Sequence, residues 1–343
     1  MVRVAVALSG GLDSSVTAYL LQQQGYDVIG ITGKMIDSEA ADLIIKNAKS
    51  VADFLGINHY TVDATKEFKN KVTDYFDNSY KMGYTPNPCI MCNKFIKWGQ
   101  IFDYAINKLG ADYIATGHYA NIKEIDGIYK LYPAKDTKKD QLYFLFLLTQ
   151  NHLSRTLFPL YNYEKSEIRG IAINNNLPTK SSKESQDICF IQKPMTTKKY
   201  LLSKMQNQKG DFINVANGKK IGEHEGYFQY TIGQRKGIGI AAARPLYVTG
   251  IDADKNIVYV GTKEYLEQKE LILNNFNFSY NYDKKEFEAM VKIRYNMQPI
   301  RAKIQISDNV KVSFIEPVNA VSKGQACVLY DINDGHLMGG GFI

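Results

Sequence analysis

Hydrophobic residues in the N-terminal half of the chain alternate between short apolar runs and helical spacing. The runs predict strands at residues 4–8, 27–32, 57–62 and 112–116. Between them, apolar positions three or four residues apart predict helices at residues 14–24, 38–55, 68–80 and 93–109. Alternating strands and helices form right-handed crossovers, so the predicted fold class is α/β with a doubly wound parallel sheet. In such sheets, ligands bind beyond the carboxyl ends of the strands.

From about residue 210 the pattern changes to short strands separated by tight turns. Strands are predicted at residues 211–215, 245–251 and 257–260, which indicates a small β-domain. The last stretch has strands at 289–295, 300–306, 310–314 and 326–330 and three glycines at 339–341, and we expect it to close into a β-barrel. The predicted domains are therefore residues 1–205, 206–265 and 266–343.

The composition is that of a multi-domain globular protein. The 343 residues are 45% hydrophobic, and nowhere do about 18 apolar residues run together, as a membrane-spanning helix requires. A cytoplasmic location without membrane contact is the expectation. The formal net charge of +7 permits a polyanionic partner but does not require one.

The chain contains four cysteines, which are few for a secreted disulfide scaffold. Cys89, Cys92 and Cys189 lie in polar, turn-like contexts and are expected to be catalytic, redox-active or metal-bound. Cys327 lies in an apolar run, which predicts a buried and inert thiol.

The segment Ser9-Gly10-Gly11-Leu12-Asp13-Ser14-Ser15 joins the first predicted strand to the first predicted helix. Its glycines let the backbone approach an anion, and its hydroxyls and the free amides of a first helical turn favour negative charge. It lacks the Gly-Lys-Ser/Thr of a Walker loop. A glycine turn with serine caps is the simpler alternative. The segment resembles the pyrophosphate loop of the N-type ATP pyrophosphatases (the PP-loop superfamily), and this resemblance implies that Asp13 helps to hold Mg²⁺ beside ATP.

Two further segments carry thiols. Two prolines and a Cys-x-x-Cys directly precede a predicted helix, so Cys92 is expected at or just before the first turn. Helix amides there, with Lys94 and Lys97, predict a lowered thiol pKa. The second thiol, Cys189, follows Lys183 in the segment 183–190. An ATP-activated oxygen and two activatable thiols together suggest sulfur insertion.

The whole chain resembles the bacterial tRNA-specific 2-thiouridylases. The motifs occur in that family's order: SGGLDSS, TPNPCIMCNKFIKW, ADYIATGHYA, KKDQLYFL, KESQDICFI, HEGYFQYTIGQRKGIGI, IRY and GQA. The resemblance implies an adenine nucleotide alpha hydrolase-like first domain. It also implies an enzyme that adenylates O2 of the wobble uridine with ATP and replaces that oxygen with sulfur.

The same resemblance implies roles for individual residues. Cys92 is the expected nucleophile and Cys189 the expected persulfide carrier. Leu8, the Ser9 to Ser15 loop, Gly33 and Gly117 are expected to contact ATP. The turn Asn87-Pro88-Cys89 is expected to contact the target base. The residues expected to contact tRNA are His118, Lys139, Asp140, Gln141, Arg294, Tyr295 and Gln325.

The expected partners are the tRNAs for Glu, Gln and Lys and a sulfur-donor protein, either a cysteine desulfurase or a persulfide relay protein. The chain departs from its relatives in two places. Gly33 stands where they usually carry Met or Leu against the adenine, and the loop after Met35 is shorter. Position 89 is Asp or Cys across the family, which leaves the role of Cys89 open.

Alternatives remain at this stage. Cys89, Cys92 and Cys189 are also suited to hold a [4Fe-4S] cluster with one open iron, whereas half a zinc site lacks its second ligand pair. A PP-loop amidase or ligase would share the phosphate loop but need no paired thiols. A tRNA-binding protein with a relict loop would not consume ATP. His118, at a strand end, is alternatively a cap of its own loop.

Overall fold

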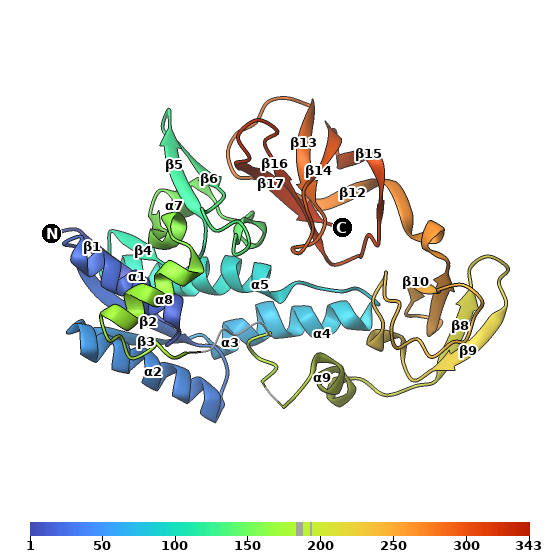
Figure 1. Cartoon of the computed structure of the whole chain (residues 1–343), viewed down its shortest axis with the longest axis horizontal. Coiled ribbons are helices and arrows are strands. Elements are labelled where there is room, and N and C mark those ends of the chain that lie inside the picture. Colours follow the sequence, from blue (N-terminus) through green and yellow to red (C-terminus); the bar gives the residue numbers. More distant parts are fainter. Residues whose placement is uncertain (183–187, 193) are drawn as a thin grey trace.

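The computed structural model describes residues 1–182, 188–192 and 194–343. Figure 1 shows an α/β region at one end, a small sheet at the other, and a barrel packed above the helices between them. Within the described residues, no helix has the length and apolarity to cross a membrane.

The α/β region is built on a five-stranded parallel sheet in the order β3-β2-β1-β4-β7. The predicted α/β fold class is confirmed. Because the strand order reverses between β1 and β4, the loops that follow these two strands open toward the same crevice. The strand bounds are β1 Arg3–Ala7, β2 Asp27–Lys34, β3 His59–Asp63, β4 Tyr113–Ala115 and β7 Thr156–Leu157.

Alternate residues of β1 point to opposite faces of the sheet and join two different cores. Val4 and Val6 pack with α1 and α2, whereas Ala5 packs with the helices that contain Phe68 and Trp98. Helices therefore cover both faces, as the sequence predicted. The helices of this region and the linker beyond it are α1 Leu12–Gln23, α2 Glu39–Leu55, α7 Gln150–Leu153, α8 Lys165–Asn174 and α9 Thr197–Lys204.

The cysteine-bearing helix begins earlier than predicted. Asn87 caps it by accepting a hydrogen bond from the Cys89 amide, and Pro88 occupies the first helical position. Cys92 consequently lies in the second turn, so its expected place at the helix start is wrong. The backbone bends at Trp98. The segments are α5 Pro88–Met91, η2 Cys92–Ile101 and α6 Phe102–Asn107, after the preceding helix of α3 Thr65–Phe68, η1 Lys69–Thr73 and α4 Asp74–Lys81.

The C-terminal strands close into the expected barrel. The order is β12-β15-β14-β13-β16-β17, and a further pairing of β12 with β17 completes the ring. The predicted strand 289–295 ends at Lys292, so Arg294 and Tyr295 lie in the following turn. The strands are β12 Glu267–Phe278, β13 Glu286–Lys292, β14 Ile300–Ile306, β15 Val310–Asn319, β16 Ala326–Tyr330 and β17 Leu337–Phe342.

The small sheet has the order β10-β11-β8-β9. Tight turns follow β8 and β10, one with Gly218 at positive φ, as the short predicted strands required. The bounds are β8 Gly210–Asn214, β9 Lys220–His224, β10 Tyr247–Asp252 and β11 Ile257–Gly261.

A hairpin of the α/β region, not predicted from the sequence, joins the barrel sheet. It comprises β5 Asn121–Ile125 and β6 Ile128–Tyr132, and Leu131 pairs with Leu337 of β17. Nearby, the buried Tyr143 hydroxyl donates to the carbonyl of Ala326 over 2.9 Å. The α/β region and the barrel therefore share one core. The domain boundaries given above stay a prediction.

The same contact explains the glycine at position 340 of β17. A Cβ on Gly340 would lie 2.9 Å from Cδ2 of Phe146 and 2.9 Å from the Cys327 carbonyl oxygen. Such distances leave no room for a methyl group between the barrel and the α/β core.

We expect Gly340→Ala to lower the free energy of unfolding by about 1–3 kcal/mol through overpacking. Gly170→Ala is the matched control, because Gly170 lies in α8 with no atom near its Cβ position. It should raise stability by roughly 0.5–1 kcal/mol. Urea titrations followed by circular dichroism measure both changes. Equal effects of the two substitutions would contradict the packing argument.

Candidate active site

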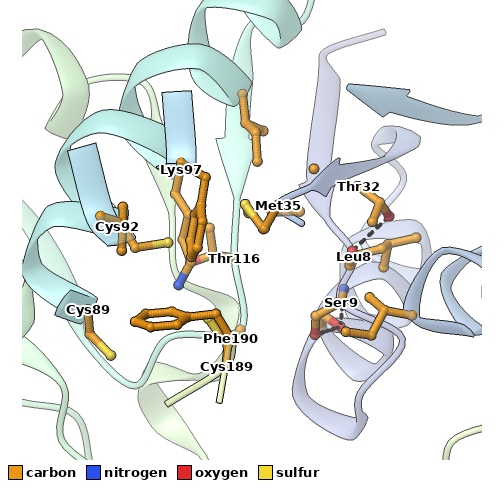
Figure 2. Close-up of a pocket in the computed structure, with 18 of the residues that line it drawn as sticks. Leu8, Ser9, Thr32, Met35, Cys89, Cys92, Lys97, Thr116, Cys189 and Phe190 are labelled. Atoms are coloured by element: carbon orange, nitrogen blue, oxygen red, sulfur yellow. Dashed lines mark hydrogen bonds between the residues drawn. The ribbon is translucent and has the colours of Figure 1, made fainter. Parts of the chain in front are cut away.

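A cavity of about 410 Å³ opens at the carboxyl ends of β1, β2 and β4. Figure 2 shows the phosphate loop, with Leu8 and Ser9, on one side and Cys89, Cys92 and Cys189 on the other. Its volume lies in the range of small-molecule sites. The sequence-predicted ATP loop and the sequence-predicted thiols thus border the same cavity.

The phosphate loop is held by its own hydroxyls. The Ser9 amide donates to Ser14 Oγ over 3.2 Å, and the Ser14 and Ser15 hydroxyls donate to the Gly11 carbonyl. Gly10 has a φ of 66°, and a Cβ there would lie 2.7 Å from Cβ of Asn47 in α2. The start of α1 has no side-chain cap, so its first amides are available to an anion.

The expected ATP residues divide into two groups. Leu8, Ser9, Asp13, Ser14, Gly33 and Gly117 line the cavity. Gly10, Gly11, Leu12 and Ser15 shape the loop behind it. Ser15 is fully buried and its hydroxyl is turned into the helix, so the expectation that this hydroxyl faces the anion is wrong.

Glycine is required at position 117 by close packing between the two loops of the crevice. A Cβ on Gly117 would lie 2.9 Å from the backbone carbon and Cβ of Asp13 and from the amide nitrogen of Ser14. Any larger residue would push the loop after β4 away from the phosphate loop.

The space that a side chain at position 33 would occupy is filled by side chains from neighbouring segments. A Cβ on Gly33 would lie 2.7 Å from Cδ1 of Ile101 and 3.0 Å from Cε of Met35. Met35 and Ile101 both line the cavity. They provide the apolar wall that relatives are expected to build from residue 33 itself, and neither residue could be assigned to this wall from the sequence.

Asp13 has partners that the sequence did not reveal. Lys165, the first residue of α8, donates to both carboxylate oxygens over 2.6 and 2.7 Å, and the Tyr119 hydroxyl donates to one of them over 3.1 Å. The Lys165 side chain is only 16% exposed. The loop carboxylate is therefore neutralised by a lysine that lies 152 residues away in sequence.

The three thiols come from two segments, with Cys89 and Cys92 on one helix and Cys189 beside Phe190 facing them (Figure 2). All four cysteines of the chain are free. Cys92 is half-buried and Cys89 and Cys189 are exposed, whereas Cys327 is buried in the barrel as expected. Lys183, the cation expected beside Cys189, lies outside the described residues, as do the other residues of 183–187.

The predicted lowering of the Cys92 pKa is wrong. Burial in the cavity wall raises the pKa of the Cys92 thiol to about 11, while Lys97 acts against this rise. Lys94 lies instead over the ring of Phe95. The pKa of Cys189 is raised to about 12, first by desolvation in the crowded cleft and then by the neighbouring thiols. The thiols of Cys92 and Cys189 are thus protonated at neutral pH in the folded protein.

His118 is buried in the wall of the cavity. Its Nδ1 lies 2.7 Å from Thr116 Oγ1, its Nε2 lies 3.4 Å from Lys97 Nζ, and its ring contacts Trp98. The backbone amide of His118 also donates to Thr116 Oγ1. Burial holds the pKa of His118 well below its usual range. The imidazole therefore caps its own loop as a neutral group.

Comparison with known proteins identifies the family. Residues 2–193, 198–262 and 268–343 match the models described as "tRNA methyl transferase HUP domain", "tRNA methyl transferase PRC-barrel domain" and "Aminomethyltransferase beta-barrel domain". The tRNA-specific 2-thiouridylase MnmA 2 of Thermoanaerobacter sp. (strain X514) is 45% identical over 99% of this chain and 97% of its own. This chain belongs to the tRNA-specific 2-thiouridylase family.

The 2-thiouridylases of Clostridium acetobutylicum and Helicobacter pylori are each 43% identical over 99% of both chains. The similarity to these family members therefore includes the phosphate loop, the thiol segments and the barrel alike.

Several residues that the family resemblance expects to contact tRNA make contacts between loops of the protein. Gln141 accepts a hydrogen bond from the Tyr119 amide, and Gln325 of the barrel donates to the Thr85 carbonyl over 2.7 Å, just before the Asn87-Pro88-Cys89 turn. Tyr295 packs on Phe144. Arg294 is exposed. The barrel thus supports the turn that carries Cys89.

Asp140 accepts hydrogen bonds from the amides of Ala134 and Leu142. Burial raises its pKa to about 6, although these amides and Lys292 favour its charged form. Because the folded state binds this proton more tightly than the unfolded state, stability should fall as pH rises from about 4 to about 6 and then level off.

We expect Asp140→Asn to remove that part of the pH dependence, and the exposed Asp308→Asn to leave it unchanged. Urea midpoints measured at half-unit steps from pH 4 to pH 7 test this expectation. The same slope in wild type and Asp140→Asn would show that another group titrates.

Proposed function

We propose that this protein uses ATP to replace O2 of the wobble uridine in tRNA with sulfur, through Cys189 as persulfide carrier and Cys92 as nucleophile. One observation carries the proposal: a phosphate loop at a helix N-terminus and three free thiols face a single cavity. A nucleotide bound at the loop would direct its phosphates toward a base held near the thiols.

In the first half-reaction, O2 of the uridine attacks the α-phosphorus of ATP and pyrophosphate leaves. The free amides at the start of α1 would bind the leaving phosphates. Met35 and Ile101 offer an apolar surface to the adenine ring. The Asp13 carboxylate is of the ligand type that Mg²⁺ prefers. A magnesium ion bound with ATP would neutralise charge on the phosphates, and Lys165 would fix the carboxylate that holds it.

In the second half-reaction, the terminal sulfur of a Cys189 persulfide attacks C2 and AMP leaves. The Cys92 thiolate then attacks Sγ of Cys189, a disulfide forms between the two cysteines, and the electron pair of the broken S–S bond stays on the sulfur of the base. A thiol reductant restores both cysteines. Cys89 lies beside them in the turn expected to contact the base.

A [4Fe-4S] cluster held by Cys89, Cys92 and Cys189 is the alternative route for sulfur. It is less favoured, because these thiols are not among the described side chains that lie close enough together to hold a metal ion. A PP-loop amidase or ligase is disfavoured, because it has no use for three thiols in the adenylation pocket.

The partners follow from the same proposal. Arg294 and Lys139 would contact the tRNA backbone, and the tRNAs for Glu, Gln and Lys would be the substrates. A cysteine desulfurase or a persulfide relay protein would load Cys189. The cytoplasmic location expected from the sequence stays a prediction.

For the first half-reaction, Asp13→Ala should lower tRNA-dependent release of pyrophosphate by a factor on the order of 100 or more. The substitution removes the carboxylate that would hold Mg²⁺ beside the phosphates, where negative charge develops. Asp308→Ala, on the exposed barrel surface, is the control and should behave as wild type. Near-normal release from Asp13→Ala would refute the assignment of the loop.

For the sulfur half, Cys92→Ser and Cys189→Ser should abolish single-turnover thiolation while pyrophosphate release continues. Cys89→Ser should retain substantial thiolation under the persulfide route. Iron content measured on anaerobically purified protein separates the two routes. Stoichiometric iron in the wild type, lost together with thiolation in Cys89→Ser, would overturn the persulfide route and support the cluster.

A further inference from the structure

Lys97 extends from η2 into the space between Cys92 and the segment that carries Cys189 (Figure 2). Among the described residues, it has no carboxylate within ion-pair distance. Lys94 on the same helix points the other way, over Phe95. The thiol side of the cavity therefore receives one lysine from this helix, and no acidic side chain of the described residues neutralises its charge.

The contacts of His118 fix the position of that ammonium. An ammonium group can only donate, so Nε2 of His118 accepts from Lys97 Nζ, and we assign the ring proton to Nδ1, which donates to Thr116 Oγ1. Nε2 faces Lys97 Nζ at 3.4 Å. Rings of Trp98 and Phe158 pack against the imidazole. A neutral histidine thus orients the lysine without cancelling its charge.

Among the described residues, the ionisable groups that line the thiol side are Cys89, Cys92, Cys189, Lys97 and His118, and Asp13 lies across the cavity. Desolvation in the cavity raises the pKa of each of the three thiols, although Cys89 and Cys189 are exposed when the whole residue is considered, and Lys97 is a cation that lowers the pKa of all three. The sequence pattern alone could not separate Lys97 from Lys94.

We propose that Lys97 is the cation that stabilises the thiolate of Cys92 for its attack on Sγ of Cys189 after the outer sulfur has bonded to the base, a role that rests on the proposed function. The Cys92 proton leaves to solvent before the attack. The thiolate then forms a bond to Sγ of Cys189 and the bond from Sγ to the outer sulfur breaks. Negative charge moves from Sγ of Cys92 to the sulfur that leaves Cys189. The Lys97 ammonium, which lies between the helix of Cys92 and the segment of Cys189, stabilises the negative charge on either sulfur.

The test compares Lys97→Gln and Lys97→Arg, with Lys94→Gln as matched control on the same helix. Alkylation of Cys92 by iodoacetamide, followed by peptide mass spectrometry between pH 7 and pH 9, reports the thiolate fraction. Lys97→Gln should slow alkylation at a given pH by roughly tenfold, the change for one unit of thiol pKa. Lys97→Arg and Lys94→Gln should stay close to wild type.

Single-turnover thiolation of tRNA by persulfide-loaded enzyme should fall at least in proportion in Lys97→Gln, while tRNA-dependent release of pyrophosphate is retained. Unchanged alkylation in Lys97→Gln would overturn the proposal. Loss of pyrophosphate release in Lys97→Gln and Lys97→Arg alike would also overturn it, because the residue would then serve the fold or the nucleotide. A wild type that releases pyrophosphate without thiolating tRNA would refute the proposed function, whereas the alkylation rates would still decide the role of Lys97.

Discussion

Close packing between the loop after β1 and the loop after β4 is the constraint on which this site depends. Gly117 lies so near Asp13 and Ser14 that no side chain fits between them. The contact brings the phosphate loop and the Thr116-to-His118 turn into one crevice. Because His118 in turn contacts Lys97, the same packing places the thiol-bearing helix opposite the phosphate loop. Both halves of the proposed reaction therefore share a single cavity.

Charge within the cavity is controlled by one lysine on each side. Lys165 neutralises Asp13 on the phosphate side, and Lys97 opposes burial on the thiol side. A buried thiol without a cation would stay protonated and unreactive, which protects it from oxidation but prevents attack. Desolvation keeps the thiols protonated before the reaction. Under the proposal, Lys97 then stabilises the thiolate of Cys92 during its attack.

The barrel contributes to the site through the core it shares with the α/β region. Tyr143 binds Ala326, Phe146 packs on the bare backbone of Gly340, and Gln325 holds the carbonyl of Thr85. The last of these contacts supports the turn before Cys89. Movement of the barrel would thus be transmitted to the turn expected to contact the base.

The sequence by itself determined the α/β order, the barrel, and the presence of the loop and thiol motifs in one enzyme. It also determined the helix predicted at residues 38–55, which forms as α2 between the cap residues Ser38 and Gly56. These features depend on local periodicity, capping and turn residues, which operate over a few positions. The tertiary structure decided what distant residues do. It paired Lys165 with Asp13, turned Lys97 inward and Lys94 outward, filled the space at Gly33 with Ile101, and joined β6 to β17. It also reversed the expected pKa shift of Cys92, because burial depends on every element packed around a thiol and not on its neighbours in the chain.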